Sequence, residues 1–234
     1  KEFISQAINS KAIILTGYNL RFSESLITFK NLIDQNIVGD LFKVLCTVGQ
    51  DINSWRSGED YRGSISTQKS QGGGVLLELS HELDYISWIF GKPKKLFGYI
   101  GNDLLDDIDV EDNAHIFMKF PKKNSNKNYL VNLNLDFLRH DKKRECYAIG
   151  SEGTLFWDSI NGLVKFYSKK DRKWKFISKN KKDIEDSYVE QMKFFMFRCN
   201  KRNTKKSLDD SLSVLEIIDK VKLSNQKKSI VSLI

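Results

Sequence analysis

The sequence predicts an α+β fold in which an open, mixed and largely antiparallel β-sheet carries its helices on one face. Seven strand-like segments follow one another between residues 95 and 177, and turns as short as GSEG and SING join some of them. Such links connect antiparallel neighbours, because parallel strands need a crossover of a dozen residues or more. Four amphipathic helical segments can cover only one side of a sheet of about six to eight strands.

The beginning of the chain is typical of the end of a different domain. Residues 3–10 have the pattern of a helix end, and AIILTGY at 12–18 has that of a short buried strand, a pair that repeats in parallel α/β sheets. A domain that opened with these two elements would leave both without partners. We therefore predict that residues 1–16 are the last helix and strand of a missing N-terminal domain, and that residues 17–234 form the next domain.

The first elements of that domain follow from their periodicity. Apolar residues recur at helical spacing over 22–37, and Gly39 is the expected C-terminal cap. Residues 41–48 alternate as a strand does, whereas the polar stretch 51–74 shows no period. Loops this long inside a compact domain are usually functional.

The rest of the chain is predicted in the same way. An apolar stripe indicates a second helix over 75–90, which Gly91 and Pro93 end. Strands are expected near 95–101, 113–120, 129–138, 144–149, 153–157, 162–167 and 173–177. Two helices close the chain, over 184–198 and 208–223, the second capped by Ser207.

Composition excludes several classes of protein. With 40% hydrophobic and 12% aromatic residues, the chain is too apolar to be intrinsically disordered. No run approaches the roughly 18 apolar residues of a membrane-spanning helix, and the N-terminus lacks an apolar signal core. The three cysteines are widely spaced without a CxxC, which indicates neither a disulfide framework nor a zinc site. We expect a cytoplasmic protein with no membrane partner and no bound metal.

The net charge of +8 raises the possibility of a polyanionic partner. The excess sits in short polar runs between apolar segments, which indicates solvated turns. Aromatic residues are interleaved with basic ones only near Trp174 and Phe176, so nucleic-acid binding is disfavoured. A titration at two salt concentrations would expose such binding, because phosphate contacts are strongly salt-dependent.

The stretch GGGVLLELSHELDY, residues 72–85, is the most informative of the chain. Glycines such as Gly73 and Gly74 let the backbone approach a ligand closely, while the first N–H groups of the following helix point outward. One interpretation of these glycines is therefore that a polar ligand binds there. The other is that they form an ordinary glycine-rich turn before the helix.

Helical geometry places Glu78, His81 and Tyr85 well away from the apolar stripe. His81 is therefore not expected in the core. Glu78 and His81 are three residues apart, so the carboxylate is predicted to orient the imidazole and raise its affinity for a proton, as acid–base chemistry requires. The alternative is an exposed surface pair.

No GxSxG, P-loop or GxGxxG occurs in the chain. Any nucleotide cofactor would therefore have most of its site upstream. The motifs that do occur resemble the glucose–fructose oxidoreductase / inositol dehydrogenase family (Gfo/Idh/MocA-type oxidoreductases) in order and spacing. They are GYNLRF at 17–22, WR at 55–56, DYR at 60–62, residues 72–85 and WIFG at 88–91.

The resemblance implies an enzyme with an N-terminal Rossmann domain that binds NAD or NADP, and a C-terminal α+β domain whose open sheet commonly forms subunit contacts. This chain corresponds to the second domain. His81 matches the family's acid–base histidine, and Glu78 lies near the place of an aspartate four residues before that histidine. Asn19 and Arg21 match the segment close to the nicotinamide. The residues implied in substrate binding are Trp55, Arg56, Tyr61, Arg62, Gly73, Gly74 and Asp84.

The leading hypothesis is an oxidoreductase that moves hydride between NAD(P) and a hydroxyl or keto carbon of a sugar or sugar derivative. His81 exchanges the hydroxyl proton in this hypothesis. The alternative is a non-catalytic binding or oligomerisation module without a cofactor domain. Strands such as YLVNLNLDFL place apolar residues on both faces, so we also expect a homodimer or homotetramer built on the sheet. A simply wet open face is the competing interpretation.

Overall fold

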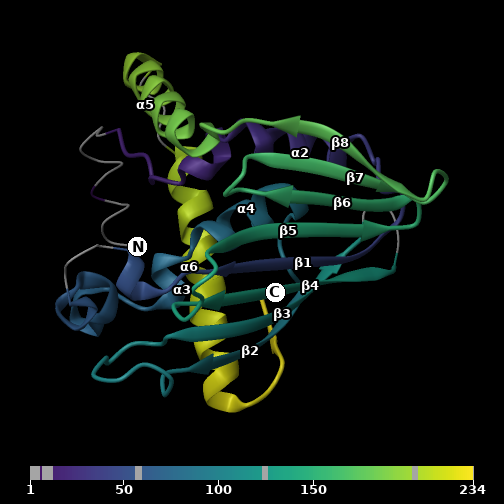
Figure 1. Cartoon of the computed structure of the whole chain (residues 1–234). Coiled ribbons are helices and arrows are strands. Elements are labelled where there is room, and N and C mark those ends of the chain that lie inside the picture. Colours follow the sequence, from purple (N-terminus) through teal and green to yellow (C-terminus); the bar gives the residue numbers. More distant parts are fainter. Residues whose placement is uncertain (1–5, 7–12, 56–59, 123–125, 202–204, 234) are drawn as a thin grey trace.

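One sheet of nine strands dominates the structure, a computed structural model that describes residues 6, 13–55, 60–122, 126–201 and 205–233 (Figure 1). The strand order is β8-β7-β6-β5-β1-β4-β3-β2-β9. Within it only β1 and β4 are paired in parallel, and the other described pairs are antiparallel. The predicted fold class, an open and largely antiparallel mixed sheet, is confirmed.

The strands have these bounds: β1 Leu41–Gly49, β2 Lys95–Gly101, β3 Asn113–Pro121, β4 Asn128–Asp136, β5 Lys143–Gly150, β6 Gly153–Asp158, β7 Leu163–Ser168, β8 Lys173–Lys179 and β9 Val231–Ser232. All the strands predicted from residue 41 onward are present within a residue or two. The two-residue strand β9 is additional. It was not foreseen because its only signal is a pair with the edge of β2.

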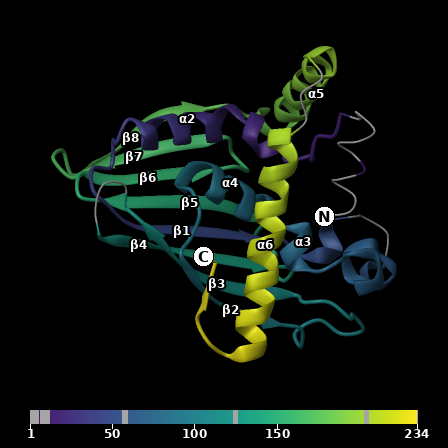
Figure 2. The same ribbon diagram turned by 180° about the vertical axis from the view of Figure 1, so that it is seen from behind.

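The helices are α2 Glu24–Asp34, α3 Val75–Glu78, α4 His81–Phe90, α5 Asp183–Lys201 and α6 Lys205–Lys227. Short 3-10 turns occupy Asn19–Phe22 (η1) and four places in the loop after β1: Ile52–Ser54, Tyr61–Gly63, Ile65–Thr67 and Lys69–Gln71. Figure 2 shows α2, α4 and α6 on one face of the sheet, with α6 running across the strands. The opposite face is the one that Figure 1 presents to the viewer.

Alternation along the strands builds the core beneath those helices. In β4, for example, Val131, Leu133 and Leu135 are buried while Leu130 is 52% exposed on the other face. Each large apolar side chain removed from water contributes about 1.5–3 kcal/mol, so this face supplies most of the favourable free energy of folding. Leu83 and Ile86 of α4 close the core from above.

The helix predicted over 75–90 is two helices. The backbone at Leu79 leaves helical geometry (φ −101°, ψ 27°), and α4 starts afresh at His81. The break turns the second segment, so that Tyr85 lies in the core, with its ring centroid 5.3 Å from that of Trp157. The predicted outward position of Tyr85 is therefore wrong, because a continuous helix was assumed.

The ends of two other helices differ from the prediction. Helix α2 stops at Asp34, and Asn36 rather than Gly39 adopts the first left-handed backbone conformation after it (φ 59°). Asparagine tolerates that region better than most residues. Helix α6 begins at Lys205, ahead of the predicted start. The predicted capping side chain of Ser207 lies outside the described side chains.

A buried polar cluster joins the start of α5 to the start of α2. The carboxylate of Asp183 accepts hydrogen bonds from the hydroxyls of Ser23 (2.6 Å) and Ser25 (2.5 Å) and from the backbone N–H of Ser25 (3.1 Å). The indole N–H of Trp157 donates to Ser25 Oγ at 2.7 Å. These bonds fix the point from which α5 rises beyond the sheet (Figure 1).

The chain before η1 differs from the prediction. Residues 13–18 form no strand, although AIILTGY was predicted to be one. A parallel strand needs a neighbour to bond to, and the described chain places none beside this segment. Of the helix end predicted at 3–10 the structure describes residue 6 alone, and that residue is helical. Among the described helices, none is both long enough and apolar enough to cross a bilayer.

Candidate active site

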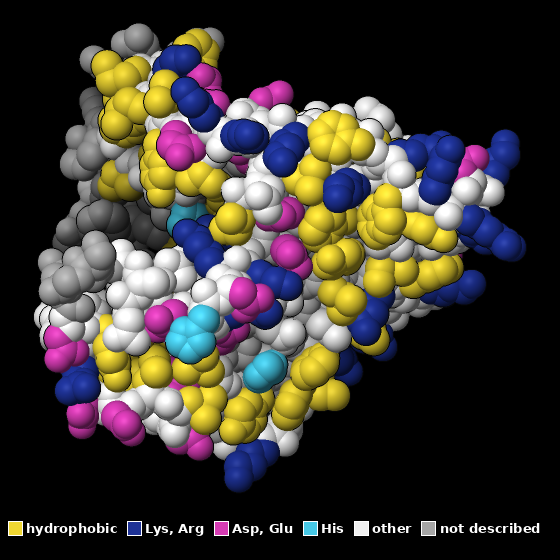
Figure 3. Space-filling view, in the orientation of Figure 1, with side chains coloured by type: hydrophobic (Ala, Val, Ile, Leu, Met, Phe, Trp, Pro, Cys, Tyr) yellow, Lys and Arg dark blue, Asp and Glu magenta, His cyan; other side chains and the backbone are white. Residues whose placement is uncertain are grey.

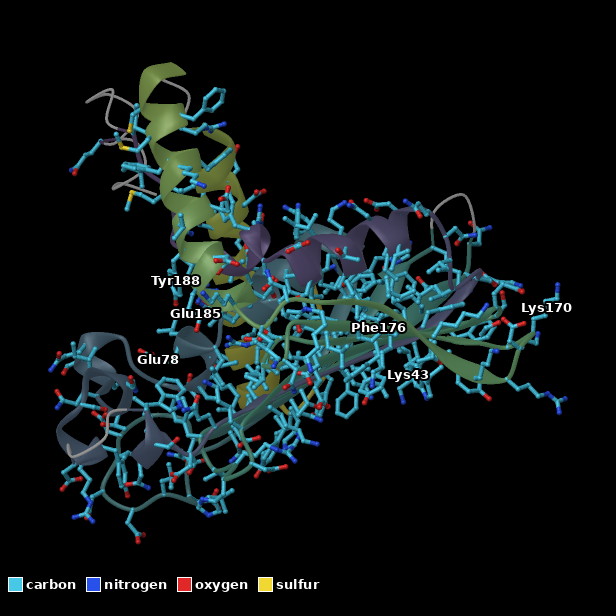
Figure 4. All side chains as sticks on the ribbon, turned by 45° about the horizontal axis from the view of Figure 1, so that its top comes forward. Lys43, Glu78, Lys170, Phe176, Glu185 and Tyr188 are labelled. Atoms are coloured by element: carbon cyan, nitrogen blue, oxygen red, sulfur yellow. The ribbon has the colours of Figure 1, made fainter. Side chains whose placement is uncertain are left out.

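A cavity of about 160 Å³ opens where α5, the start of α4 and the ends of β1 and β5 meet. The loop after β1 closes it from another side. Figure 4 shows Glu78 facing Glu185 and Tyr188 of α5 at this place. Its lining combines titratable and apolar side chains: Asn19, Val48, Gly49, Gln50, Trp55, Glu78, Leu79, His81, Lys142, Lys143, Arg144, Ile160, Ile184 and Tyr188.

His81 is the first residue of α4 and lines the cavity. Its ring packs edge-on against Tyr18, with the centroids 5.4 Å apart, and its Nδ1 atom is buried without a hydrogen-bond partner. Burial, and secondarily the positive charge of Arg144, lower the pKa of His81 to about 4. The imidazole is therefore neutral near pH 7, which leaves a nitrogen lone pair free to accept a proton.

Glu78 also lines the cavity, but it does not act on His81 as predicted. The break after α3 separates the two residues, and no hydrogen bond joins their side chains. The pKa of His81 is lowered, not raised. The prediction assumed a continuous helix, in which positions three apart are neighbours. The alternative of an exposed surface pair is wrong too, since His81 is largely buried.

Asn19 reaches the cavity from η1. It is 3% exposed, and its Nδ2 donates a hydrogen bond to Ser187 Oγ at 2.8 Å. This bond ties η1 to α5, the helix whose residues Ile184 and Tyr188 also line the cavity. A cofactor contact of Asn19 stays a prediction.

Arg21 and Asp84 lie together away from the cavity. Arg21 donates two hydrogen bonds to Asp84, from Nε (2.8 Å) and Nη2 (2.7 Å), and a third from Nη1 to Asp210 (2.7 Å). Asp84 is 1% exposed. Both groups are thus occupied in joining η1, α4 and α6, which leaves neither free for the predicted contacts with cofactor or substrate in this structure.

The predicted substrate loop contributes one residue to the cavity. Trp55 lines it, and its ring packs edge-on against Phe137 at 5.2 Å. Arg56 lies outside the described residues. Tyr61 donates a hydrogen bond to the carbonyl of Asp106 (3.2 Å), and Arg62 lies beside Asp107, so neither of them lines the cavity.

The glycines before α3 make contacts within the chain. A Cβ on Gly73 would lie 2.5 Å from the carbonyl oxygen of Ser66, and the N–H of Gly74 donates to that same oxygen. The next two N–H groups, of Val75 and Leu76, donate to the carbonyl and the carboxylate of Glu111. In this structure Glu111 thus occupies the first N–H groups of α3, and a ligand contact of Gly73 or Gly74 stays a prediction.

The strongest feature that was not predicted is the basic run Lys142, Lys143 and Arg144, which begins one residue before β5. All three line the cavity. Arg144 Nε lies 2.8 Å from Oε1 of Glu82, a carboxylate with no exposed surface. Burial outweighs Arg144 and raises the pKa of Glu82. Three basic residues next to the start of a predicted strand were a visible signal, but only the pairing of β5 with β1 brings them to the cavity that His81 lines.

Among the described residues, no three His, Cys, Asp or Glu side chains are grouped so that they could hold a metal ion. Two buried free thiols, Cys46 and Cys146, lie opposite each other in β1 and β5 with their sulfur atoms 3.3 Å apart.

Sequence comparison gives the family. The family model of the GFO/IDH/MocA C-terminal domain matches residues 26–156, more than half of the chain. The chain belongs to the GFO/IDH/MocA family. The resemblance noted in the motifs is thereby confirmed. No curated protein matches the sequence.

Solved structures share the GFO/IDH/MocA fold at low identity. Levoglucosan dehydrogenase in complex with NADH superposes with a TM-score of 0.78 at 15% identity, over 96% of this chain and 67% of that one. Aldose-aldose oxidoreductase from Caulobacter crescentus, complexed with glycerol, has a TM-score of 0.80 at 16% identity, over 98% and 66%. An NAD binding oxidoreductase from Klebsiella pneumoniae reaches 0.80 at 13%, over 100% and 69%.

Proposed function

We propose that the chain is the substrate-binding C-terminal domain of an NAD(P)-dependent oxidoreductase that acts on a hydroxyl or keto carbon of a sugar or sugar derivative. The observation that carries the proposal is His81, a neutral imidazole on the wall of a polar cavity in a chain of an oxidoreductase family. Similar structures include a sugar dehydrogenase with NADH and an aldose-aldose oxidoreductase.

His81 acts as the proton acceptor in this proposal. Oxidation of a carbinol removes a hydride from carbon and a proton from oxygen, and a neutral imidazole within hydrogen-bond reach takes the proton. Tyr18 packs against the ring and Asn19 is bonded to α5, so both hold the cavity wall in place. Trp55 and Tyr188 provide aromatic surface on either side of a bound sugar.

The cavity does not fit a whole dinucleotide cofactor. Its volume of about 160 Å³ is below the roughly 300–1,000 Å³ of sites for ligands of that size. A glycine-rich dinucleotide fingerprint is also missing from the sequence. We therefore propose that NAD or NADP binds mainly to a separate Rossmann domain, which precedes residues 17–234. The nicotinamide supplies the hydride chemistry, and this chain supplies the substrate site and the proton acceptor.

The test is a His81→Gln substitution in protein that carries both domains, assayed by the absorbance of NAD(P)H. Loss of a general base lowers kcat by about 10²-fold or more, and the substrate KM changes less. His140→Gln is the matched control, since the side chain of His140 is 89% exposed. A His81→Gln enzyme that keeps more than about a tenth of wild-type kcat contradicts the role of His81.

We also propose that the open face of the sheet forms a homodimer or homotetramer. One cross-strand row on this face runs Phe97, Phe117, Asn132, Leu45, Tyr147, Phe156, Lys165 and Phe176. Phe117 is 49% and Phe176 61% exposed. Apolar side chains run across this face in Figure 3. A contiguous exposed apolar patch of this kind marks an interface more often than a free surface.

A further inference from the structure

The cavity beside His81 carries an excess of positive charge. Lys142, Lys143 and Arg144 line it, and Glu78 is the single carboxylate among the described residues that does so. Imidazole adds no charge, because burial keeps His81 neutral. The wall that faces a bound molecule is therefore basic.

Backbone pairing holds these cations in place. Lys143 lies opposite Gly49, and Arg144 opposite Val48, in the ladder between β5 and β1. Just before β5, the N–H of Asp51 donates to the carbonyl of Arg139 at 2.6 Å, which ties this turn to the loop that carries Trp55. The basic run is thus anchored on both sides of the cavity rather than placed on a free turn.

Neither lysine forms an ion pair with a described residue, although Lys143 lies near enough to Asp141 to help lower the pKa of that carboxyl. Arg144 is balanced by Glu82, 2.8 Å away. In the described chain, by contrast, no carboxylate oxygen lies within 4.0 Å of Lys142 or Lys143. The nearest carboxylates in the sequence have other partners: Asp141 pairs with Arg139, and Asp51 accepts hydrogen bonds from the backbone N–H and the side-chain amide of Asn53.

We infer that the substrate of this site is a sugar acid, whose carboxylate binds Lys142 and Lys143 while a hydroxyl carbon faces His81. The inference rests on the proposed function. Both groups must belong to one small molecule, because the cavity of about 160 Å³ holds one. A carboxylate is flat and compact, whereas a phosphate would fill much more of this space. An ion pair formed in a partly enclosed cavity is also stronger than one in bulk water.

The experiment is a calorimetric binding titration of protein that carries both domains, with and without NAD⁺, using matched pairs of probes. These are glucuronate with glucose, and galacturonate with galactose; glucose 6-phosphate tests for a phosphate ligand. At least one acid is expected to bind about tenfold or more tightly than its neutral partner, in line with charge-assisted hydrogen bonds. The double variant Lys142→Gln/Lys143→Gln should lose about that factor for the acid and less than about twofold for the neutral sugar.

The control removes the same number of charges far from the cavity. Lys169→Gln/Lys170→Gln lies in the turn between β7 and β8, and Figure 4 shows Lys170 at the far end of the sheet. This variant should bind the acid like the wild type. Neutral sugars that bind as tightly as the acids, tighter binding of glucose 6-phosphate, or no binding of either acid would overturn the inference.

Failure of the inference is distinguishable from failure of the proposed function. If His81→Gln abolishes turnover but the lysine variant leaves binding unchanged, the oxidoreductase role stands and the sugar-acid inference falls. If the lysine variant weakens binding of the acid while His81→Gln retains turnover, the acid site stands and the role of His81 falls.

Discussion

The burial of His81 should make the folded protein measurably less stable in acid. In an unfolded chain the pKa of histidine is about 6.5, and in this fold the pKa of His81 is about 4. A group with a lower pKa in the folded state binds protons more readily in the unfolded state, so acid favours unfolding. The contribution of His81 to the free energy of unfolding is therefore complete above pH 6.5 and is lost as the pH falls toward 4. By linkage, the free energy of unfolding falls by about 2 kcal/mol at pH 5 and by about 3 kcal/mol below pH 4 from this residue alone.

The perturbation is His81→Gln, which replaces the imidazole by a polar group that does not titrate. Urea denaturation of wild type and variant at pH 7 and pH 5 gives four free energies of unfolding. Between these pH values the wild type should lose about 2 kcal/mol more than the variant. His140→Gln, at an exposed position, should follow the wild type.

If the free energy of unfolding falls equally from pH 7 to pH 5 in the wild type and in His81→Gln, within about 0.5 kcal/mol, the reasoning is refuted. An imidazole that titrates near its unfolded value has no linkage to folding. The same result would remove the reason for treating His81 as neutral and poised to accept a proton. A direct titration of the His81 ring by NMR checks the pKa itself.

Three further outcomes are expected. Trp157→Phe removes the hydrogen bond to Ser25 and should lower the free energy of unfolding by about 1–2 kcal/mol in urea. Gly74→Ala should cost more than Gly72→Ala: both have positive φ (106° and 82°), which alone costs about 1 kcal/mol or more, but only at Gly74 does a Cβ meet Glu111, 2.6 Å away. Equal costs would show that Glu111 moves freely aside. Phe156→Lys on the open face should lower the molar mass measured by light scattering toward that of a monomer, and an unchanged mass would argue against this interface.

Much of the fold was predictable because its signals are local. Alternation and short turns indicated every strand from β1 to β8, and these patterns hold regardless of what lies beside each strand. The break between α3 and α4 was not predictable, since Leu79 and Ser80 are compatible with a helix and only tertiary packing favours the core position of Tyr85. A two-residue strand such as β9 carries no period at all.

In the candidate site too, some residues were predictable from local motifs and others depend on partners that are distant in sequence. His81 and Trp55 were found from motifs, and both line the cavity. The partners of Asp84 and the contacts of Gly74 depend on Arg21 and Glu111, which are distant in sequence and carry no signal of pairing. The basic run in β5 was equally hidden, because its meaning arises from the register with β1.

The parallel pairing of β1 with β4 means that the central strand is synthesised well before the strands that pair with it. Strand β1 ends at Gly49, yet its two neighbours, β4 and β5, begin only at Asn128 and Lys143. At a synthesis rate of about 5–20 residues per second, the central strand emerges from the ribosome roughly 4 to 16 s before its first partner exists. During that interval its alternating apolar residues are exposed on a nascent chain. Chaperones that shield such segments, or slow codons placed after the strand β5, are therefore expected to affect the yield of this protein more than its final stability.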